Sequence, residues 1–215
     1  MSTLITGAGL IGRLTAQLLV EAGEPIVLAD LRVPDVSDLS GPGSVTPVAC
    51  DVADFDALRT LIETHSVTRV IHTAALLSTA IRQRPLEGIR VNVMGTANLL
   101  ECARQMGLGR LVFASSATVV YNCFGSLGPD PLPEDAPMRM QSEQPASIYA
   151  STKLAGEHLA GVFHALYGVD AISLRYAAVL GGRLDAEPSG VPGRLMHALG
   201  SAALAGRPAK LDDPF

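Results

Sequence analysis

The chain has 215 residues, of which 48% are hydrophobic and 17% charged, so it is long enough for one large domain with a substantial core. Its net charge of −5 argues against binding to a polyanion such as a nucleic acid, because no basic block offsets phosphate repulsion. With no tryptophan and only 4% aromatic residues, aliphatic side chains must fill the core, which suits a buried parallel sheet covered by helices.

The cysteines and the apolar runs indicate the cellular compartment of the protein. Cys50, Cys102 and Cys123 form no CxxC pair, which fits a reducing compartment and predicts no metal site; the first two lie in apolar patterns typical of a core. No apolar run approaches the roughly 18 residues that span a bilayer. The first strand begins at about Thr3 and leaves no room for a signal peptide. We expect a cytoplasmic protein without a membrane partner.

Short apolar runs alternate with segments of helical periodicity. This alternation predicts βαβ units and an α/β fold with a Rossmann-type, doubly wound parallel sheet. The expected strands are Leu4-Ile5, Ile26 to Leu28, Val45 to Ala49, Val70-Ile71, Leu111 to Phe113 and Ala171 to Leu174.

Two of the helical segments carry clear end signals. Gly23 follows the first where a C-cap glycine belongs, and Asp54 precedes the second at an N-cap position. The expected buried faces are Leu14, Leu18, Leu19 and Ala22 in the first helix and Leu58, Leu61 and Ile62 in the second.

A glycine-rich turn joins the first strand to the first helix, in the order Gly7, Ala8, Gly9, Leu10, Ile11, Gly12. Gly7 allows a tight turn, Gly9 lets the backbone approach a pyrophosphate, and Gly12 lets the helix pack on the strand. The pyrophosphate would lie on the helix N-terminus, where free N–H groups favour an anion. A GxGxxG pattern between a strand and a helix predicts a dinucleotide site.

Asp30 closes the second strand, eighteen residues after Gly12. A carboxylate there accepts hydrogen bonds from the adenosine ribose and repels a 2′-phosphate, which favours NAD over NADP. Arg13 and Arg32 lie nearby in the sequence and could bind such a phosphate, although a solvated loop charge is the simpler interpretation of Arg32.

A hydroxyl cluster, Ser115 to Thr118, follows the apolar run at 111–114. It lies at the carboxyl end of an expected strand, which is where open α/β sheets bind ligands. A serine there can hydrogen-bond a substrate oxygen while another group moves its proton.

Two stretches rich in glycine and proline interrupt the alternation. Residues 122–146 predict a long irregular loop, either a wall of the substrate site or a variable surface insertion. Residues 181–193 look like the exit from the nucleotide-binding domain, with helical sequence resuming at about Arg194. We therefore expect an NAD-binding domain over residues 1–180 and the incomplete beginning of a substrate-binding region over residues 181–215.

Tyr149 and Lys153 form a YxxxK pattern. Positions i and i+4 of a helix share a face, so the phenol and the ammonium can meet. A neighbouring cation stabilises phenolate and lowers the pKa of a tyrosine from its usual ~10, as an acid/base for an alcohol or carbonyl requires. The pattern also occurs by chance, with two surface residues as the simpler interpretation.

Taken in order, these features resemble the extended short-chain dehydrogenases/reductases, also called the NAD-dependent epimerase/dehydratase family. The resemblance extends over about residues 3–182. Its motifs are TGAGLIG at 6–12, Asp30, Cys50-Asp51-Val52, Val70 to Ala75, Val91 to Thr96, Ser115 to Thr118, YASTK at 149–153 and Leu174-Arg175-Tyr176.

The resemblance implies roles for single residues. Ser116 would be the catalytic serine, with Ser115 its near competitor, and Tyr149 the acid/base. Lys153 would favour the phenolate and bind the nicotinamide ribose, and Asn92 would complete the active-site hydrogen bonds. Toward NAD the resemblance implies contacts from Gly7, Gly9, Leu10, Ile11, Gly12, Asp30, Asp51, Val52, Ala74, Ala75, Tyr149 and Lys153. His72 fits the family pattern but is interpreted as structural, and no histidine spacing suggests a metal.

Several departures limit what the resemblance implies. The family usually has a GxxGxxG turn, one residue longer than the turn here. Dehydratases have an Asp-Glu pair where Ala117-Thr118 stand, so sugar dehydration is not expected. Ala178 occupies the position of an asparagine that sugar-nucleotide epimerases commonly use, which weakens that interpretation.

The sequence therefore favours an NAD-dependent oxidoreductase that transfers a hydride to or from a secondary alcohol or ketone, carbohydrate-derived compounds included. A nucleotide-sugar epimerase is the alternative, and a non-catalytic dinucleotide-sensing protein is a second. The resemblance also implies a homodimer formed through the helix after Asn92 and the YxxxK helix. Leu99, Leu100 and Ala103 could serve that surface, and packing on the sheet explains them equally well.

Overall fold

The computed structural model describes residues 1–120, 131, 133–137, 147–179 and 190–209. Cys123, most of the loop expected at 122–146, and the domain boundary expected near residue 180 lie outside these ranges. That boundary stays a prediction.

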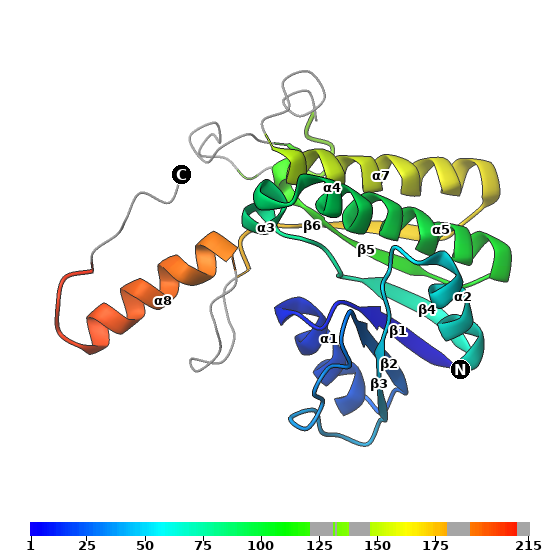
Figure 1. The fold of residues 1–215 in the computed structure, drawn as a ribbon, viewed down its shortest axis with the longest axis horizontal. Coiled ribbons are helices and arrows are strands. Elements are labelled where there is room, and N and C mark those ends of the chain that lie inside the picture. Colours follow the sequence, from blue (N-terminus) through cyan, green and yellow to red (C-terminus); the bar gives the residue numbers. More distant parts are fainter. Residues whose placement is uncertain (121–130, 132, 138–146, 180–189, 210–215) are drawn as a thin grey trace.

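Six parallel strands form one sheet, in the order β3-β2-β1-β4-β5-β6 (Figure 1). Every strand expected from the sequence is present, and the doubly wound fold is confirmed. The strand order reverses direction between β1 and β4, the point at which such sheets bind ligands. The bounds are β1 Ser2–Thr6, β2 Ile26–Asp30, β3 Val45–Ala49, β4 Val67–His72, β5 Leu111–Ser116 and β6 Ala171–Tyr176.

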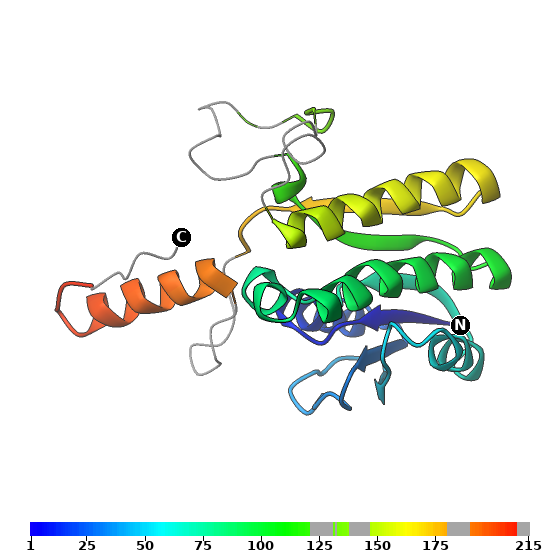
Figure 2. The ribbon, with the colours of Figure 1, turned by 45° about the horizontal axis from the view of Figure 1, so that its top comes forward.

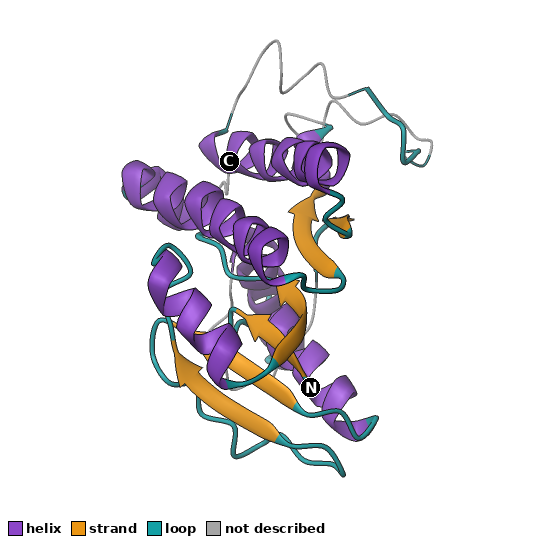
Figure 3. Cartoon of the chain, turned by 90° about the vertical axis from the view of Figure 1, so that its right-hand side faces the viewer, coloured by secondary structure: helices purple, strands orange, loops and turns teal. Residues whose placement is uncertain are grey.

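Helices lie on both sides of this sheet (Figure 3). In Figure 2, α5 and α7 run along the same direction, and the two helices contact each other and β5. The described helices are α1 (Leu10–Glu21), α2 (Phe55–Thr64), α3 (Ser78–Gln83), α4 (Pro85–Ile89), the π-helix η1 (Arg90–Met94), α5 (Gly95–Met106), the 3-10 helix η2 (Ala117–Val119), α7 (Ile148–Tyr167) and α8 (Gly190–Leu204).

Side chains that alternate along the strands supply two cores. Leu4 and Val27 face the larger core, which α2, α5 and α7 cover, whereas Ile5 and Leu28 face the smaller one beneath α1. The predicted buried face of α2 is confirmed, because Leu58, Leu61 and Ile62 all belong to the larger core. The core positions expected for Cys50 and Cys102 are also confirmed, because both residues are buried.

The predicted ends of the first two helices are also confirmed. The Asp54 side chain accepts a hydrogen bond from the amide of Ala57 at 3.0 Å, as an N-cap residue should. Gly23 follows the end of α1 with a φ of +84°, a conformation that favours glycine.

The predicted buried face of α1 is wrong at Leu14, Leu18 and Ala22, and of the four predicted residues Leu19 alone packs against the core. Leu14 and Leu18 are 52% and 66% exposed, whereas Gly12, Ala16 and Val20 face the sheet. The reason is the distance between the helix and the sheet. A Cβ at Gly12 would lie only 1.9 Å from the carbonyl oxygen of Gly7, so only the face with small residues fits there.

The structure also decides two expectations about helices later in the chain. Leu99, Leu100 and Ala103 are buried in the chain's own larger core, so packing on the sheet, and not a subunit surface, explains them. Helix α8 begins at Gly190, four residues earlier than the sequence indicated, and projects away from the sheet (Figure 1). In the part of the chain that the structure describes, no helix is both long and apolar enough to cross a membrane.

Candidate functional site

The glycine turn lies at the carboxyl end of β1, against the end of β4. Gly7 has a φ of +89°, and a Cβ on it would lie 2.6 Å from the amide nitrogen of Ala74. Thr73 donates its hydroxyl proton to the carbonyls of Thr6 and Gly7, at 2.8 and 2.9 Å. Packing and backbone conformation therefore account for the glycines at positions 7 and 12.

Gly9 has no such explanation within the protein. It is the N-cap residue of α1, with a φ of −74°, and a Cβ built on it meets no atom within 4 Å. The amides of Leu10, Ile11 and Gly12 come before the first hydrogen bond of α1, from Arg13 to Gly9. A bare backbone beside free N–H groups at a helix N-terminus is what a phosphate requires.

We expect Gly9→Ala to leave the free energy of unfolding within about 1 kcal/mol of the parent, because the methyl group meets nothing and the backbone conformation suits alanine. NAD affinity should fall at least about tenfold, because the methyl group occupies the space of the pyrophosphate. Urea unfolding and calorimetric titration with NAD measure the two quantities. Unchanged affinity would remove Gly9 from the cofactor site.

Asp30 stands beside this turn at the end of β2. One carboxylate oxygen accepts the amide of Ala8 at 2.7 Å and the other accepts the amide of Leu31 at 2.7 Å. Each oxygen has a further lone pair for a ribose hydroxyl. The carboxylate is thus held in place by the turn that would receive the pyrophosphate.

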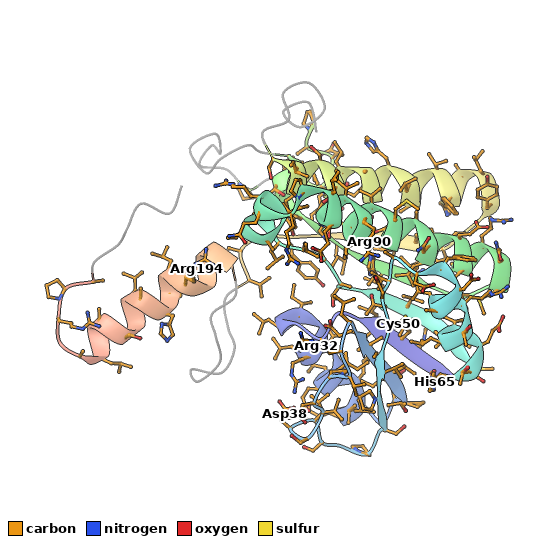
Figure 4. The ribbon with its side chains drawn as sticks, in the orientation of Figure 1. Arg32, Asp38, Cys50, His65, Arg90 and Arg194 are labelled. Atoms are coloured by element: carbon orange, nitrogen blue, oxygen red, sulfur yellow. The ribbon has the colours of Figure 1, made fainter. Side chains whose placement is uncertain are left out.

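The two arginines considered for a 2′-phosphate are placed differently. Arg13 donates to the carbonyl of Asp35 at 2.6 Å and forms an ion pair with Asp38. Arg32 is exposed on the loop after β2, in the same part of the molecule as Asp38 (Figure 4). Since Arg13 is engaged by acidic residues of this chain, the geometry favours NAD without a 2′-phosphate.

The remaining residues expected around NAD lie at the carboxyl ends of β3 and β4. Asp51 is partly exposed, and its carboxylate accepts a hydrogen bond from the Arg90 guanidinium at 2.8 Å. Val52 is buried, and its side chain packs so closely on Gly95 that it would touch a Cβ placed there. Only the backbone of Val52 is therefore available to a nucleotide. Ala74 and Ala75 are half-buried beside the glycine turn.

Tyr149 and Lys153 lie in the first two turns of α7, which Ser147 caps by accepting the amide of Ala150 at 3.4 Å. The Lys153 Nζ atom lies 5.7 Å from the centre of the Tyr149 ring, as the YxxxK spacing predicts. The same atom donates to the carbonyl of Ala114 at 2.7 Å. This bond ties the lysine to β5, two residues before Ser116.

Burial governs the charge of Lys153. The residue is 3% exposed, and this burial lowers the pKa of its ammonium from 10.5 to about 8. The cation also lies 4.9 Å from the centre of the Phe113 ring. A largely desolvated ammonium beside a phenol produces a strong local electric field, because little water screens its charge.

The structure separates the two candidate serines. Ser115 donates to the carboxylate of Glu157 at 2.6 Å, and Arg175 binds the same carboxylate at 2.8 Å. Ser116 accepts from the hydroxyl of Thr118 at 2.9 Å, and no described residue takes the proton of Ser116 itself. Ser116 can therefore donate to a substrate oxygen, whereas Ser115 is committed to an ion pair.

Asn92 is buried in the π-helix that precedes α5. Its side-chain oxygen accepts the amide of Leu76 at 2.8 Å, and its side-chain nitrogen donates to the Leu76 carbonyl at 3.1 Å and to Thr152 at 3.0 Å. Thr152 donates in turn to the carbonyl of Tyr149 at 2.7 Å. The structure thus connects the asparagine to the helix that carries Tyr149 and Lys153.

Three residues of the site were given no individual role from the sequence, although Thr118 belongs to the hydroxyl cluster at 115–118. Thr118 contacts the Ser116 hydroxyl, Thr152 links Asn92 to α7, and Glu157 engages Ser115. The positions contain a weak signal, since Glu157 stands one helical turn beyond Lys153 on the same face of α7. In the described ranges no cluster of His, Cys, Asp and Glu could hold a metal ion.

A parallel sheet in this strand order, with a glycine turn at the switch point and an aspartate at the end of β2, defines a dinucleotide-binding Rossmann protein. The family model described as the NAD dependent epimerase/dehydratase family matches residues 3–212. The chain belongs to that family. NAD is its cofactor.

Individual relatives agree with this assignment. The chain is 32% identical over 195 residues to a UDP-glucuronate 4-epimerase of Thermodesulfobacterium geofontis, with 85% of this chain and 58% of that protein covered. Among solved structures it is similar to a Thermus thermophilus UDP-glucose 4-epimerase in complex with NAD (TM-score 0.79, 29% identity, 97% of this chain and 64% of that one).

A third relative has a different activity. A GalE-like L-threonine dehydrogenase from Cupriavidus necator, in its holo form, superposes with a TM-score of 0.78 at 26% identity, over 97% of this chain and 64% of that one. The chain thus spans between 58% and 64% of the length of these three relatives.

Proposed function

We propose that the protein is an oxidoreductase that transfers a hydride between NAD and a secondary alcohol or ketone, carbohydrate-derived compounds included. The observation that carries the proposal is the buried ammonium of Lys153 over the Tyr149 ring, tied to the strand that ends at Ser116. It supplies an acid/base group, a cation and a hydroxyl donor where the sheet binds ligands.

Each residue has one task in this proposal. NAD supplies the hydride acceptor or donor. Ser116 donates a hydrogen bond to the substrate oxygen and fixes its position. Tyr149 takes the hydroxyl proton during oxidation and returns it during reduction, and Lys153 stabilises the tyrosinate formed in between. Asn92 holds the start of α7 through Thr152, so the phenol stays in place.

Epimerisation of a nucleotide-sugar is the second candidate, because two of the relatives above are named as 4-epimerases. It would use the same three side chains and return the hydride to the opposite face of the ring. Ala178 stands where such enzymes commonly have an asparagine, which favours the first candidate.

A screen of secondary alcohols, sugar acids, amino-acid alcohols and nucleotide-sugars with NAD tests the proposal. We expect the absorbance of NADH at 340 nm to rise with one class of substrate, in proportion to the ketone formed. Isomerisation of a nucleotide-sugar with no net NADH would replace the first candidate by the second. NAD binding without turnover of any class would favour a dinucleotide sensor.

We also propose a homodimer through the outer side of α7. Val162 and Leu166 are exposed there, one helical turn apart. Leu166→Glu should convert a dimer into a monomer, because the carboxylate would be buried without a partner. Sedimentation velocity measures the change, with Leu18→Glu on the exposed side of α1 as the control. A parent chain that sediments as a monomer would contradict the proposal.

A further inference from the structure

His72 lies at the end of β4 and is 1% exposed. Both of its ring nitrogens have hydroxyl partners from other elements. Nδ1 is 2.7 Å from the Thr6 hydroxyl, the last residue before the glycine turn, and Nε2 is 3.1 Å from the Thr96 hydroxyl in α5. A buried polar side chain with two partners of this kind joins the elements from which they come.

The protons of this network can be assigned from the hydrogen bonds. The Thr96 hydroxyl donates its single proton to the backbone carbonyl of Asn92 at 2.7 Å. Toward His72 it can then only accept, so Nε2 of the ring carries the proton. Nδ1 is consequently the acceptor, and Thr6 donates to it. The order of donation is Thr6 to His72, His72 to Thr96, and Thr96 to Asn92.

The surroundings of the ring agree with a neutral histidine. Burial, and secondarily the charge of Lys153, lower the pKa of His72 to about 3. The imidazole stacks on Phe113 with ring centres 5.8 Å apart, and the Lys153 ammonium lies over the same phenyl ring. A protonated imidazole there would repel the ammonium, and its Nδ1 could no longer accept the proton of the Thr6 hydroxyl.

Asn92 is the residue that this network reaches, and its backbone is unusual. It lies in the π-helix Arg90–Met94, where the regular α-helical hydrogen bonds are interrupted. The Thr96 hydroxyl supplies a bond to its carbonyl, while its side chain holds Leu76 and Thr152. The Thr96 hydroxyl therefore holds the backbone from which the side-chain amide of Asn92 projects.

We propose that His72 is a positioning residue: as a neutral, Nε2-protonated imidazole it joins the strand that leads into the glycine turn to the π-helical turn that presents Asn92. It thereby holds the glycine turn and the π-helical turn at a constant separation. The catalytic meaning of this role rests on the proposed function, whereas the hydrogen-bond network does not.

The tautomer can be observed directly. In the full chain labelled with ¹⁵N-histidine, two-bond ¹H–¹⁵N correlation spectra should show His72 with a protonated Nε2 and no titration between pH 5 and pH 9. The spectrum of His72→Gln assigns the signal among the five histidines. A protonated Nδ1, or a titration near pH 6.5, would overturn the proposal.

The positioning role is tested at Leu76, whose amide donates to the Asn92 side chain. Thr96→Val keeps the shape of the side chain but removes the hydroxyl, and Thr96→Ser keeps the hydroxyl. We expect hydrogen exchange at the Leu76 amide to become at least about tenfold faster in Thr96→Val. It should stay within about threefold of the parent in Thr96→Ser.

Amides of the core strands, such as Leu4 and Leu28, serve as the internal reference, because general destabilisation accelerates them together with Leu76. If Leu76 accelerates only in step with these amides, or equally in both variants, His72 and Thr96 are merely structural. None of these measurements needs a substrate. A chain that turns over nothing would refute the proposed function and leave the network to be decided on its own.

Discussion

Tyr149→Phe is expected to lower kcat by about 10²–10⁴-fold while NAD affinity stays within about threefold of the parent. The substitution removes one oxygen atom and leaves the ring in place beside Lys153, so the cation keeps its 4.9 Å contact with Phe113 and its bond to Ala114. The proton transfer to and from the substrate oxygen is lost with that oxygen. Single-turnover rates and calorimetric NAD titrations separate the two quantities.

The matched control lies on the same helix. Tyr167→Phe also removes one phenolic oxygen, but Tyr167 is exposed at the far end of α7, where its ring packs on Phe163. It should turn over substrate at the rate of the parent. Equal activity of Tyr149→Phe and the parent would show that the acid/base group is another residue.

Lys153→Met is expected to lower kcat by about 10²-fold or more and yet to leave the protein as stable as the parent, or more stable by up to about 2 kcal/mol at pH 7. A pKa lowered from 10.5 to about 8 corresponds to a cost of about 3 kcal/mol for keeping the ammonium buried. Methionine removes that cost, and the Ala114 carbonyl loses a donor, which costs about 1–3 kcal/mol.

The pH dependence of stability isolates this effect. Between pH 8 and pH 10.5 the unfolded chain keeps the lysine proton and the folded chain does not, so Lys153 makes the free energy of unfolding rise with pH in that window. The rise is about 1.4 kcal/mol per pH unit in the difference between parent and Lys153→Met. Groups that do not interact with Lys153, such as Cys50, titrate equally in both chains and cancel.

Urea unfolding of both chains from pH 7 to pH 10.5 provides the measurement. Lys153→Arg is measured beside Lys153→Met, because its guanidinium stays charged over this whole pH range. The larger guanidinium group also strains the buried site. A loss of several kcal/mol at pH 7 in Lys153→Met would mean that the lysine is a stabilising residue of the core.

The strands β1, β2 and β5 were predictable because each is a short run buried on both faces, which leaves little choice of conformation. The buried face of α1 was not. Leu14 and Leu18 fit helical periodicity, but the glycine turn brings α1 so close to the sheet that Gly12 and Ala16 must face inward. Hydrophobic periodicity records which residues are apolar and carries no information on how near two elements approach.

The candidate site also has a part that the sequence predicts and a part that it does not. Tyr149 and Lys153 could be paired from their spacing, since a helix fixes which positions share a face. The choice between Ser115 and Ser116 depends on Glu157 and Arg175, which lie 42 and 60 residues away from Ser115 in the sequence. Contacts of that kind arise only when β5, α7 and β6 come together.

The π-helical turn at Arg90–Met94 amounts to one residue inserted into an otherwise continuous helical stretch. Deleting a single residue there would restore regular α-helical winding and leave the segment after it in nearly the same orientation, because the wider π-turn takes up the extra residue locally. Leu99 and Leu100 would therefore stay buried. The extra residue shapes the turn that presents Asn92 and not the core beyond it, so a single-residue deletion at this point should remove the site while keeping the fold.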